Sequence, residues 1–302
     1  MTRGGHVPVL ADDVLELLRP ERAKLIVDCT VGLGGHSCML LDRAPSDARL
    51  IGIDVDETNL RQARENLAEF GERVRLFQAN FSQLTTVLDE ADESSVDAIL
   101  ADLGVASTQL DDAERGLSFQ ADGPLDMRLD PRLDETAEGL INRLSERELA
   151  DLIYEYGQER YSRRVARAIV QQRKKGRIAT TGQLADIVSR SLPRPARSTR
   201  RGVHPATRTF QALRIAVNDE MSVLETLLDS LPNALAPGGR AAVISFHSLE
   251  DRPVKHTFNR LAADGTVEVL TKKPITPGPD EMARNPRSRS AKLRAIERIN
   301  TG

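Results

Sequence analysis

The sequence of 302 residues contains few cysteines, few aromatic residues and no long apolar stretch. Its two cysteines, Cys29 and Cys38, cannot form a disulfide framework or a four-ligand zinc site, so they favour a reducing cytoplasm. The five histidines lack the spacing of metal ligands, and we therefore expect no metal site. No apolar run approaches the roughly 18 residues of a membrane-spanning helix. No signal-peptide pattern opens the chain either, which disfavours membrane and secreted proteins.

Aromatic residues make up only 3% of the chain and tryptophan is absent, so a stacking platform for single-stranded nucleic acid is poorly supplied. A net charge of −3 also argues, taken alone, against a nucleic-acid partner. The charge is unevenly distributed, however. Residues 160–214 carry 15 Lys and Arg and one acid, whereas residues 1–159 carry 15 against 33 and residues 215–302 carry 12 against 11. Because a solvated helical face normally mixes both signs, the block at +14 is a candidate polyanion surface.

Short apolar runs typical of buried strands alternate with helical patterns in the first hundred residues, and a further strand follows near residue 240. The expected strands cover residues 25–29, 50–54, 74–77, 96–101 and 240–246. This alternation predicts an α/β fold in which a mostly parallel sheet is covered by helices on both faces.

Residues 109–215 interrupt this pattern, since they contain no convincing strand. Their helical patterns cover residues 146–156, 161–174 and 181–191. We therefore expect an all-helical insertion, a candidate substrate-recognition domain, inside one α/β domain. The α/β domain comprises residues 1–108 and 216–302, and its second part ends in a basic tail. The stretch 274–289, rich in Pro, Arg and Ser, is expected to be loop.

A glycine-rich turn lies between the first expected strand and the helix that follows it. Gly32 and Gly34 allow a tight turn and a close approach of the backbone to a ligand. A dinucleotide fingerprint places a third glycine where this chain has Ser37, so a phosphate-binding role is weakly supported.

Acidic residues close two further strands. Asp54 ends the second strand about 20 residues beyond the glycines, where an acid can accept hydrogen bonds from ribose hydroxyls. Asp54 is alternatively a helix N-cap, although Asp56 and Thr58 are equally placed for that role. NAD enzymes and S-adenosylmethionine methyltransferases share this combination. The fourth strand ends in Asp102, and a polar residue there favours the methyltransferases.

Six blocks of sequence resemble the bacterial 16S rRNA cytosine-N4 methyltransferases. They are Asp28–Ser37, Asp102–Asp111, Gly123–Arg128, His204–Arg214, Ser245–Arg252 and Asn285–Arg294. The resemblance implies a class I S-adenosylmethionine methyltransferase fold, Rossmann-like, with an inserted helical substrate domain. It implies methyl transfer from S-adenosyl-L-methionine to N4 of a P-site cytidine in 16S rRNA, within the small ribosomal subunit and in the cytoplasm.

The same resemblance implies a set of cofactor contacts. By position these fall on Gly34, Gly35, His36, Asp54, Phe81, Asp102 and Gln109. The backbone of the turn would meet the methionine part, and Phe81 would offer an apolar face to the adenine. Phe81 is alternatively a core residue and His36 a first-turn helix residue. Ala106 and Thr108 depart from the family, which more commonly has Ser and Pro there, and this puts the loop geometry beside Gln109 in doubt.

An exocyclic cytosine amine is a poor nucleophile, so catalysis must orient it towards the methyl donor and accept its hydrogen bonds. Many amino-methyltransferases have Asp or Asn followed by Pro-Pro and an aromatic residue at this point, a motif that Asp102 lacks. We expect Asp102, with Ser245 or His247, to line the pocket for the target base. His247 is equally well interpreted as a structural hydrogen-bonding residue at a strand end.

The target base must leave its stack to reach the donor, and basic residues must hold the RNA phosphates. The candidates for this role are Arg200, Arg201, Arg208 and Arg214 in the basic block and Arg287 and Arg289 in the tail, with Lys292 and Arg294 beside them. Arg208 and Arg214 are six residues apart and share a helix face poorly, so one of them is a candidate structural residue.

Two other functions compete with this interpretation. An NAD-linked oxidoreductase is disfavoured by the incomplete glycine fingerprint and by the basic insertion. A non-catalytic RNA-binding ribosome assembly factor on a methyltransferase scaffold is disfavoured by the polar groups at Asp54, Asp102 and Gln109. The sequence leaves open whether the protein is a homodimer.

Overall fold

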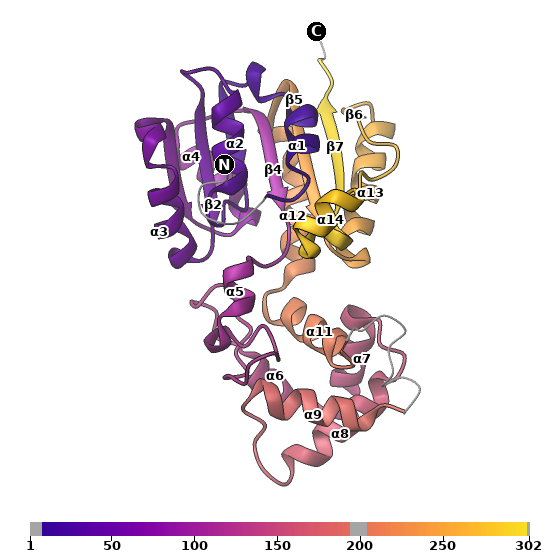
Figure 1. The fold of residues 1–302 in the computed structure, drawn as a ribbon. Coiled ribbons are helices and arrows are strands. Elements are labelled where there is room, and N and C mark those ends of the chain that lie inside the picture. The colour runs from indigo at the N-terminus through magenta and orange to yellow at the C-terminus, as the bar shows by residue number, and fades with distance from the viewer. Residues whose placement is uncertain (1–7, 194–203, 301–302) are drawn as a thin grey trace. The chain divides into compact units, whose positions relative to one another are not determined.

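The computed structural model describes residues 8–193 and 204–300, and the chain forms two compact units (Figure 1). The first unit combines the described residues up to Gly104 with those from Met221 onward, and the second unit is Val105–Glu220. The sequence patterns predict the two boundaries after residues 108 and 215. Within the described ranges, no helix is long and apolar enough to cross a membrane.

The first unit is built on a seven-stranded sheet with the strand order β3-β2-β1-β4-β5-β7-β6. Its strands are β1 (Leu25–Asp28), β2 (Arg49–Asp54), β3 (Val74–Gln78), β4 (Val96–Asp102), β5 (Leu235–Ser245), β6 (Val267–Val269) and β7 (Lys292–Arg298). The pairs from β3 to β5 are parallel, whereas β7 is antiparallel to both β5 and β6. The expected α/β class with a mostly parallel sheet is confirmed.

Helices cover both faces of this sheet (Figure 1). They are α1 (Ala11–Leu18), α2 (Gly35–Arg43), α3 (Glu57–Asn66), α4 (Leu84–Glu90), α12 (Glu220–Ala234), α13 (Ser248–Ala263) and α14 (Pro279–Arg284). Short 3-10 turns lie between them at η1 (Pro20–Arg22), η2 (Ala68–Arg73), η3 (Phe81–Gln83) and η5 (Pro286–Ser290).

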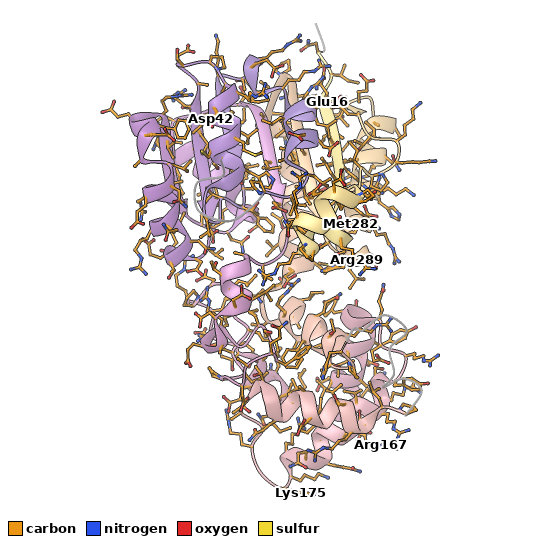
Figure 2. The ribbon with its side chains drawn as sticks, in the orientation of Figure 1. Glu16, Asp42, Arg167, Lys175, Met282 and Arg289 are labelled. Atoms are coloured by element: carbon orange, nitrogen blue, oxygen red, sulfur yellow. The ribbon has the colours of Figure 1, made fainter. Side chains whose placement is uncertain are left out.

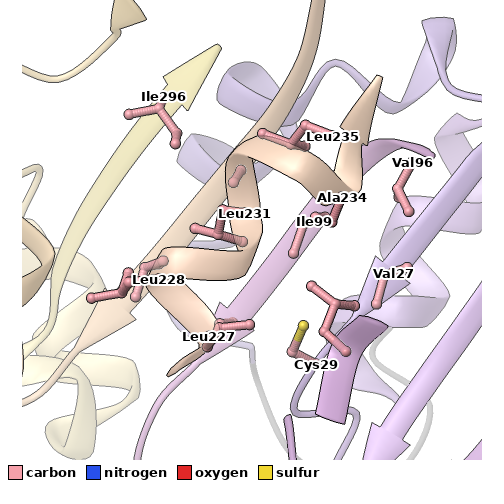
Figure 3. Packing of buried hydrophobic residues seen from close by; sticks show 14 of the residues in the cluster. Val27, Cys29, Val96, Ile99, Leu227, Leu228, Leu231, Ala234, Leu235 and Ile296 are labelled. Atoms are coloured by element: carbon pink, nitrogen blue, oxygen red, sulfur yellow. The ribbon is translucent and has the colours of Figure 1, made fainter. Parts of the chain in front are cut away.

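The alternation of side chains along the strands assigns neighbouring residues to opposite faces. Ile26 of β1 packs in one cluster with α1 and α2, and Val27 packs in another with α4, α12 and α13. Figure 3 shows Leu227 and Leu231 of α12 among the buried side chains of the cluster that contains Val27. Because both faces of β1 are buried, its sequence is a continuous apolar run that ends in Asp28, and such a run was recognisable as a strand.

The sequence patterns do not predict β6 and β7, because charged residues interrupt the apolar pattern of β7. Lys292 and Arg294 both bond to Asp251 of α13, at 3.1 and 2.7 Å. These ion pairs compensate the two charges, so the strand joins the sheet with Leu293 and Ile296 buried. Both basic residues of this part of the tail are therefore engaged within the fold.

The expectation of a loop over residues 274–289 is wrong for its second half, which forms α14 and η5. Pro279 suits the first position of a helix, and Asp280 and Glu281 complement the positive end of the helix dipole. The Glu281 Oε1 atom also accepts a hydrogen bond of 2.8 Å from the backbone of Leu10, which fixes this segment to the start of the described chain.

The described part of the second unit contains helices, with one short bridge pairing Pro124 and Thr180, and no named strand. Its elements are α5 (Ser107–Asp111), η4 (Ala113–Arg115), α6 (Ala137–Arg143), α7 (Glu146–Gly157), α8 (Ser162–Arg173), α9 (Thr181–Ser191) and α11 (Thr207–Val217). Capping boxes begin two of these helices, with Ser145 and Glu148 at α7 and Thr180 and Gln183 at α9. Their apolar faces meet in a separate core, which makes this unit a helical insertion with its own packing.

Candidate active site

The glycine turn between β1 and α2 requires glycine at its end. Gly34 is the N-cap of α2 with a φ of +84°, a left-handed conformation that side chains disfavour. A Cβ atom there would also lie 3.1 Å from the side chain of Leu67. Gly32 has a φ of +52°. The turn therefore exposes backbone at the carboxyl end of β1, where Rossmann-like sheets bind their ligands.

The carboxylate of Asp54 is bonded directly to this turn. Its Oδ2 accepts hydrogen bonds from the backbone N–H of Gly32 at 3.0 Å and from Asn59 at 3.2 Å, and its Oδ1 accepts from Asp56 at 2.8 Å. Burial raises the pKa of Asp54 to about 6, although the hydrogen bonds from Asp56 and Asn59 oppose the rise. Asp56, through its 2.9 Å bond to Thr58, is the residue that caps α3. The alternative interpretation of Asp54 as the N-cap is therefore excluded.

A buried polar cluster lies under the first turn of α2. The Nε2 atom of His36 donates to the carbonyl of Val9 at 2.9 Å, which leaves Nδ1 facing the Oδ2 of Asp102 at 3.6 Å. Asp28 accepts hydrogen bonds from Ser37 Oγ at 2.7 Å and from the backbone of Thr30 at 3.1 Å. Burial raises the pKa of Asp28, and His36 acts against this rise.

Asp102 ends β4 beside the glycine turn, since its backbone N–H donates to Thr30 Oγ1 at 2.7 Å. Its Oδ1 is buried and has no hydrogen-bond partner among the described residues. Burial raises the pKa of Asp102 to about 6; His36 opposes this rise, and Asp28 and Glu250 add to it. A buried acceptor without a partner costs folding free energy, so the site is suited to a ligand that brings a donor.

Ser245 ends β5, the strand paired with β4, and Asp102 lies opposite Ile244 in that pair. Ser245 is buried, and its hydroxyl donates to the carbonyl of Lys292 at 3.4 Å. Ser245 is thus one residue beyond the strand partner of Asp102, and because side chains alternate along a strand, its side chain lies on the opposite face of the sheet from that of Asp102. The expectation that the two residues share a pocket stays a prediction.

His247 is the N-cap of α13. Its Nδ1 accepts from the backbone N–H of Glu250 at 3.3 Å, and its Nε2 lies 3.1 Å from the Oε1 of Glu250. The other oxygen of Glu250 accepts from the backbone of Phe246 at 2.7 Å. His247 and Glu250 therefore form a reciprocal capping arrangement, which supports the structural interpretation of His247.

Two cofactor candidates remain, Phe81 and Gln109. Phe81 is half-buried in η3 and packs on the core beneath the sheet, so it can supply a partly exposed ring face while contributing to packing. Gln109 belongs to the second unit, where its Oε1 accepts from the backbone of Ala106 at 3.0 Å.

The candidate RNA-binding arginines differ in how they are bonded. Arg214 is mostly buried and makes two bonds of 2.7 and 2.9 Å to Glu220. Arg208 is exposed, donates to the carbonyl of Gln158 at 3.1 Å and lies 4.0 Å from Glu159. Two tail candidates, Arg287 and Arg289, are exposed on η5. The other two candidates, Arg200 and Arg201, lie outside the described residues.

Two residues that the structure places in this polar cluster and at the start of α13, Asp28 and Glu250, were not singled out in the sequence. Asp28 ends β1 just as Asp54 and Asp102 end β2 and β4, so an acid at the end of each central strand was the available signal. Glu250 follows His247 by three residues, which is the spacing of a capping box.

The site thus combines a glycine turn after β1, an acid at the end of β2 bonded to that turn, and an acid at the end of β4 whose Oδ1 has no partner among the described residues. These are features of a Rossmann-like α/β protein that binds a nucleoside cofactor. The chain belongs to the MraW methylase family, whose model matches residues 3–299.

Curated relatives match nearly the whole chain. It is 53% identical over 294 residues to the ribosomal RNA small subunit methyltransferase H of Sorangium cellulosum (strain So ce56), covering 97% of this chain and 91% of the relative. It is 49% identical over 309 residues to the protein of that name from Geobacter sulfurreducens (strain ATCC 51573 / DSM 12127 / PCA), covering 97% and 99%. A solved rRNA methylase from Streptococcus thermophilus aligns over 96% of this chain and 94% of its own, with 11% identity and a TM-score of 0.44.

Proposed function

We propose that this protein transfers a methyl group from S-adenosyl-L-methionine to the exocyclic N4 of a P-site cytidine in 16S rRNA. Membership of a methylase family and relatives named for ribosomal RNA small subunit methylation support the rRNA methyltransferase part. The specificity for N4 of cytidine rests on the sequence blocks described above. The substrate is the RNA of the small ribosomal subunit, and the reaction takes place in the cytoplasm.

The observation that carries the proposal is the unpartnered carboxylate oxygen of Asp102. An amine that is being methylated carries N–H groups that need acceptors, and an ionised carboxylate is the strongest acceptor in the protein inventory. Asp102 has its backbone bonded to Thr30 and one oxygen 3.6 Å from His36, so its position is held from two sides. A fixed acceptor of this kind lowers the barrier because it needs no reorganisation during the reaction.

The cofactor supplies the activated methyl group when bound. The exposed backbone at Gly34, Gly35 and His36 would bind its methionine part, and Asp54 would accept the ribose hydroxyls. Phe81 would contact the adenine, and Asp102 and Gln109 would hydrogen bond near the reacting end. Asp54 has the partners that such a role needs, because three hydrogen bonds hold its carboxylate in place.

The residues around the target base have different tasks. Asp102 accepts hydrogen bonds from the N4 amine and orients its lone pair towards the methyl group. Ser245, at the end of the neighbouring strand β5, would lie at the edge of the pocket. His247 acts as a positioning residue through the start of α13, because both of its ring nitrogens face Glu250.

The competing functions predict different ligands. An oxidoreductase would bind NAD, and a non-catalytic assembly factor would bind RNA without any cofactor. The buried Oδ1 of Asp102, which has no partner among the described residues, lowers the free energy of unfolding. A scaffold without catalytic function would gain nothing from this loss of stability.

Calorimetric titration of the purified full chain with S-adenosylmethionine and, separately, with NAD distinguishes these functions. We expect saturable binding of S-adenosylmethionine and no heat from NAD. Incubation with small ribosomal subunits and labelled S-adenosylmethionine, followed by nucleoside analysis, should then yield labelled N4-methylcytidine. Absence of cofactor binding would rule out the enzyme, and a label on another nucleoside would rule out the N4 specificity.

A further inference from the structure

Most of the described arginines of the second unit lie beside an acidic residue of the same unit. The paired residues are Arg128, Arg132, Arg143, Arg147, Arg167, Arg177, Arg190, Arg208 and Arg214. The high positive charge of residues 160–214 is therefore not spread evenly over the surface that the structure describes.

Unpaired cations gather on and around α8. Arg163, Arg164, Lys174 and Lys175 are exposed and form no ion pair with any described residue. Arg160 lies over the ring of Tyr161, 4.6 Å from its centre, and this contact leaves the guanidinium charge uncompensated. Figure 2 shows Lys175 in the segment after α8, together with Arg167 on α8, which is paired with Glu146.

The sequence of α8 separates a buried face from a basic face. Ser162, Val165, Ala166 and Ile169 are buried, at the spacing of one helical stripe. Arg163, Arg164, Arg167 and Gln171 occupy the opposite side and are all exposed. They recur at intervals of three and four residues, so their side chains lie next to one another along the helix.

This basic face borders a hollow of about 500 Å³. The residues lining it are Arg163, Arg164, Arg167, Ala168, Gln171 and Ser191. None of these described lining residues is acidic, and only Ala168 is apolar. The guanidinium groups of Arg163 and Arg164 have no acidic partner among the described residues, so they repel each other unless an anion lies near them, whereas Arg167 is also paired with Glu146.

We propose that this α8 surface, defined as Arg163, Arg164, Arg167 and Gln171, binds the phosphate backbone of the substrate RNA. The inference rests on the proposed function and names where the substrate is held. Arginine presents several N–H donors in a planar fork that matches phosphate oxygens, and Gln171 adds an amide for a ribose or phosphate oxygen. Arg214 is a poorer candidate, because its donors are already bonded to Glu220.

The composition of the α8 surface favours RNA over other anionic partners. A membrane-binding helix needs large apolar residues beside its basic ones. A protein interface commonly contains an aromatic or aliphatic centre. The α8 surface has neither, since its one apolar lining residue is Ala168.

The test compares two double substitutions that remove the same charge. The variant Arg163→Gln/Arg164→Gln removes two unpaired arginines. The control Arg143→Gln/Arg177→Gln removes two exposed arginines of the same unit that are paired with Glu135 and Glu138. Binding of each full-length protein to purified small-subunit rRNA is measured from about 50 to 300 mM KCl, together with S-adenosylmethionine binding as a check of folding.

We expect the α8 variant to raise the Kd for RNA about tenfold or more and to lower the slope of log Kd against log salt by about two, one for each lost phosphate contact. The control should change the slope by less than about half a unit. The conservative variant Arg163→Lys/Arg164→Lys should restore most of the slope, because it restores the charge. All variants should bind S-adenosylmethionine as the unaltered protein does.

Equal RNA affinity and equal salt slopes in the α8 variant and the control would overturn the proposed surface. Loss of binding to assembled small subunits with unchanged binding to their naked rRNA would assign the surface to an acidic protein, and would overturn it equally. Failure of the unaltered protein to methylate small-subunit RNA would instead contradict the proposed function itself. The two failures are therefore distinguishable.

Discussion

The end of the sheet in the first unit and the α8 surface in the second both carry uncompensated charge, but of opposite sign and in opposite surroundings. The Oδ1 atom of Asp102 is buried and has no partner among the described residues, whereas Arg163 and Arg164 are exposed to solvent. An unpartnered buried acceptor is costly, so it is suited to a small ligand with a defined donor. Unpaired exposed arginines cost little and can meet a long polyanion at many points. This difference suits the end of the sheet to the chemical step and the α8 surface to RNA binding.

Charges that are paired inside the protein form a third group, and they stabilise the fold. Arg294 is buried in β7 against Asp251, and Arg214 is bonded to Glu220. These residues have the same chemical type as the α8 arginines, so residue type alone does not show which cation meets RNA. What distinguishes Arg163 and Arg164 from Arg294 and Arg214 is that they have no acidic partner among the described residues.

The largest expected effect comes from removing the charge of Asp102. We expect Asp102→Asn to lower the single-turnover rate of methyl transfer by about 100-fold or more, because a fixed charged acceptor next to the reacting amine is lost. The matched control is Asp97→Asn in the same strand, since Asp97 is compensated by the backbone N–H groups of Lys24 and Leu25 at 2.7 and 2.9 Å. Asp97→Asn should reduce stability by about 1 kcal/mol and leave the rate unchanged. Equal rates in the two variants would contradict the assignment.

A smaller effect is expected from the glycine turn. Gly34→Ala forces a side chain into a left-handed conformation 3.1 Å from Leu67, and we expect about 1–2 kcal/mol of lost stability. We also expect S-adenosylmethionine to bind at least about tenfold more weakly, because the backbone of the turn would shift. A tenfold change in Kd corresponds to about 1.4 kcal/mol of binding free energy. Gly71→Ala is the control, because Gly71 has a φ of +56° with nothing within 4 Å of the added Cβ.

Thermal unfolding and calorimetry measure both variants. The control should lose stability through backbone strain alone and keep its cofactor affinity. Equal cofactor binding by Gly34→Ala and Gly71→Ala would show that the turn is not part of the site.

The raised pKa values of Asp54 and Asp102 predict opposite pH trends for activity and for stability. Burial raises the pKa of both Asp54 and Asp102 to about 6, and both act in ionised form. The rate should therefore fall below pH 6 by up to about tenfold per pH unit for each acid, or about 100-fold per unit when both are required. Between pH 4 and 6 the folded state binds more protons at these groups than the unfolded state, so their contribution to stability rises as the pH falls.

Single-turnover rates and thermal melting of the cofactor-free protein are measured over pH 5 to 8. In Asp102→Asn the change of stability with pH should be smaller than in the unaltered protein. A rate that stays constant down to pH 5 would contradict the requirement for ionised acids.

The smallest effect on activity is expected at His247. Its ring caps α13, so His247→Ala should cost about 1 kcal/mol of stability and leave the single-turnover rate with saturating cofactor unchanged. His247→Asn should recover the stability, because Asn is a favoured N-cap. If His247→Ala lowered the rate as much as Asp102→Asn does, the structural interpretation would be wrong and His247 would line the pocket for the target base.

Local sequence patterns predicted most of the fold and part of the candidate site. The strands of the parallel sheet were recognisable because both of their faces are buried, as in β1. The glycine turn and Asp54 were recognisable because ligand binding at the end of a parallel strand needs those residue types there.

Pairing between distant residues could not be predicted from local patterns. The strand β7 was missed because the partner that compensates Arg294, Asp251, is 43 residues away. For the same reason the sequence did not distinguish Arg214, which has an acidic partner, from Arg163 and Arg164, which have none among the described residues. The reciprocal bonding of His247 and Glu250 was within reach, since it follows a known three-residue spacing.

The central claim is tested most directly by mass mapping of the methylated nucleosides in small-subunit RNA from cells that lack this protein. We expect N4-methylcytidine to be missing from the P-site position and to return when the unaltered chain is supplied, but not when Asp102→Asn is supplied. An unchanged level of N4-methylcytidine in the cells that lack the protein would contradict the account.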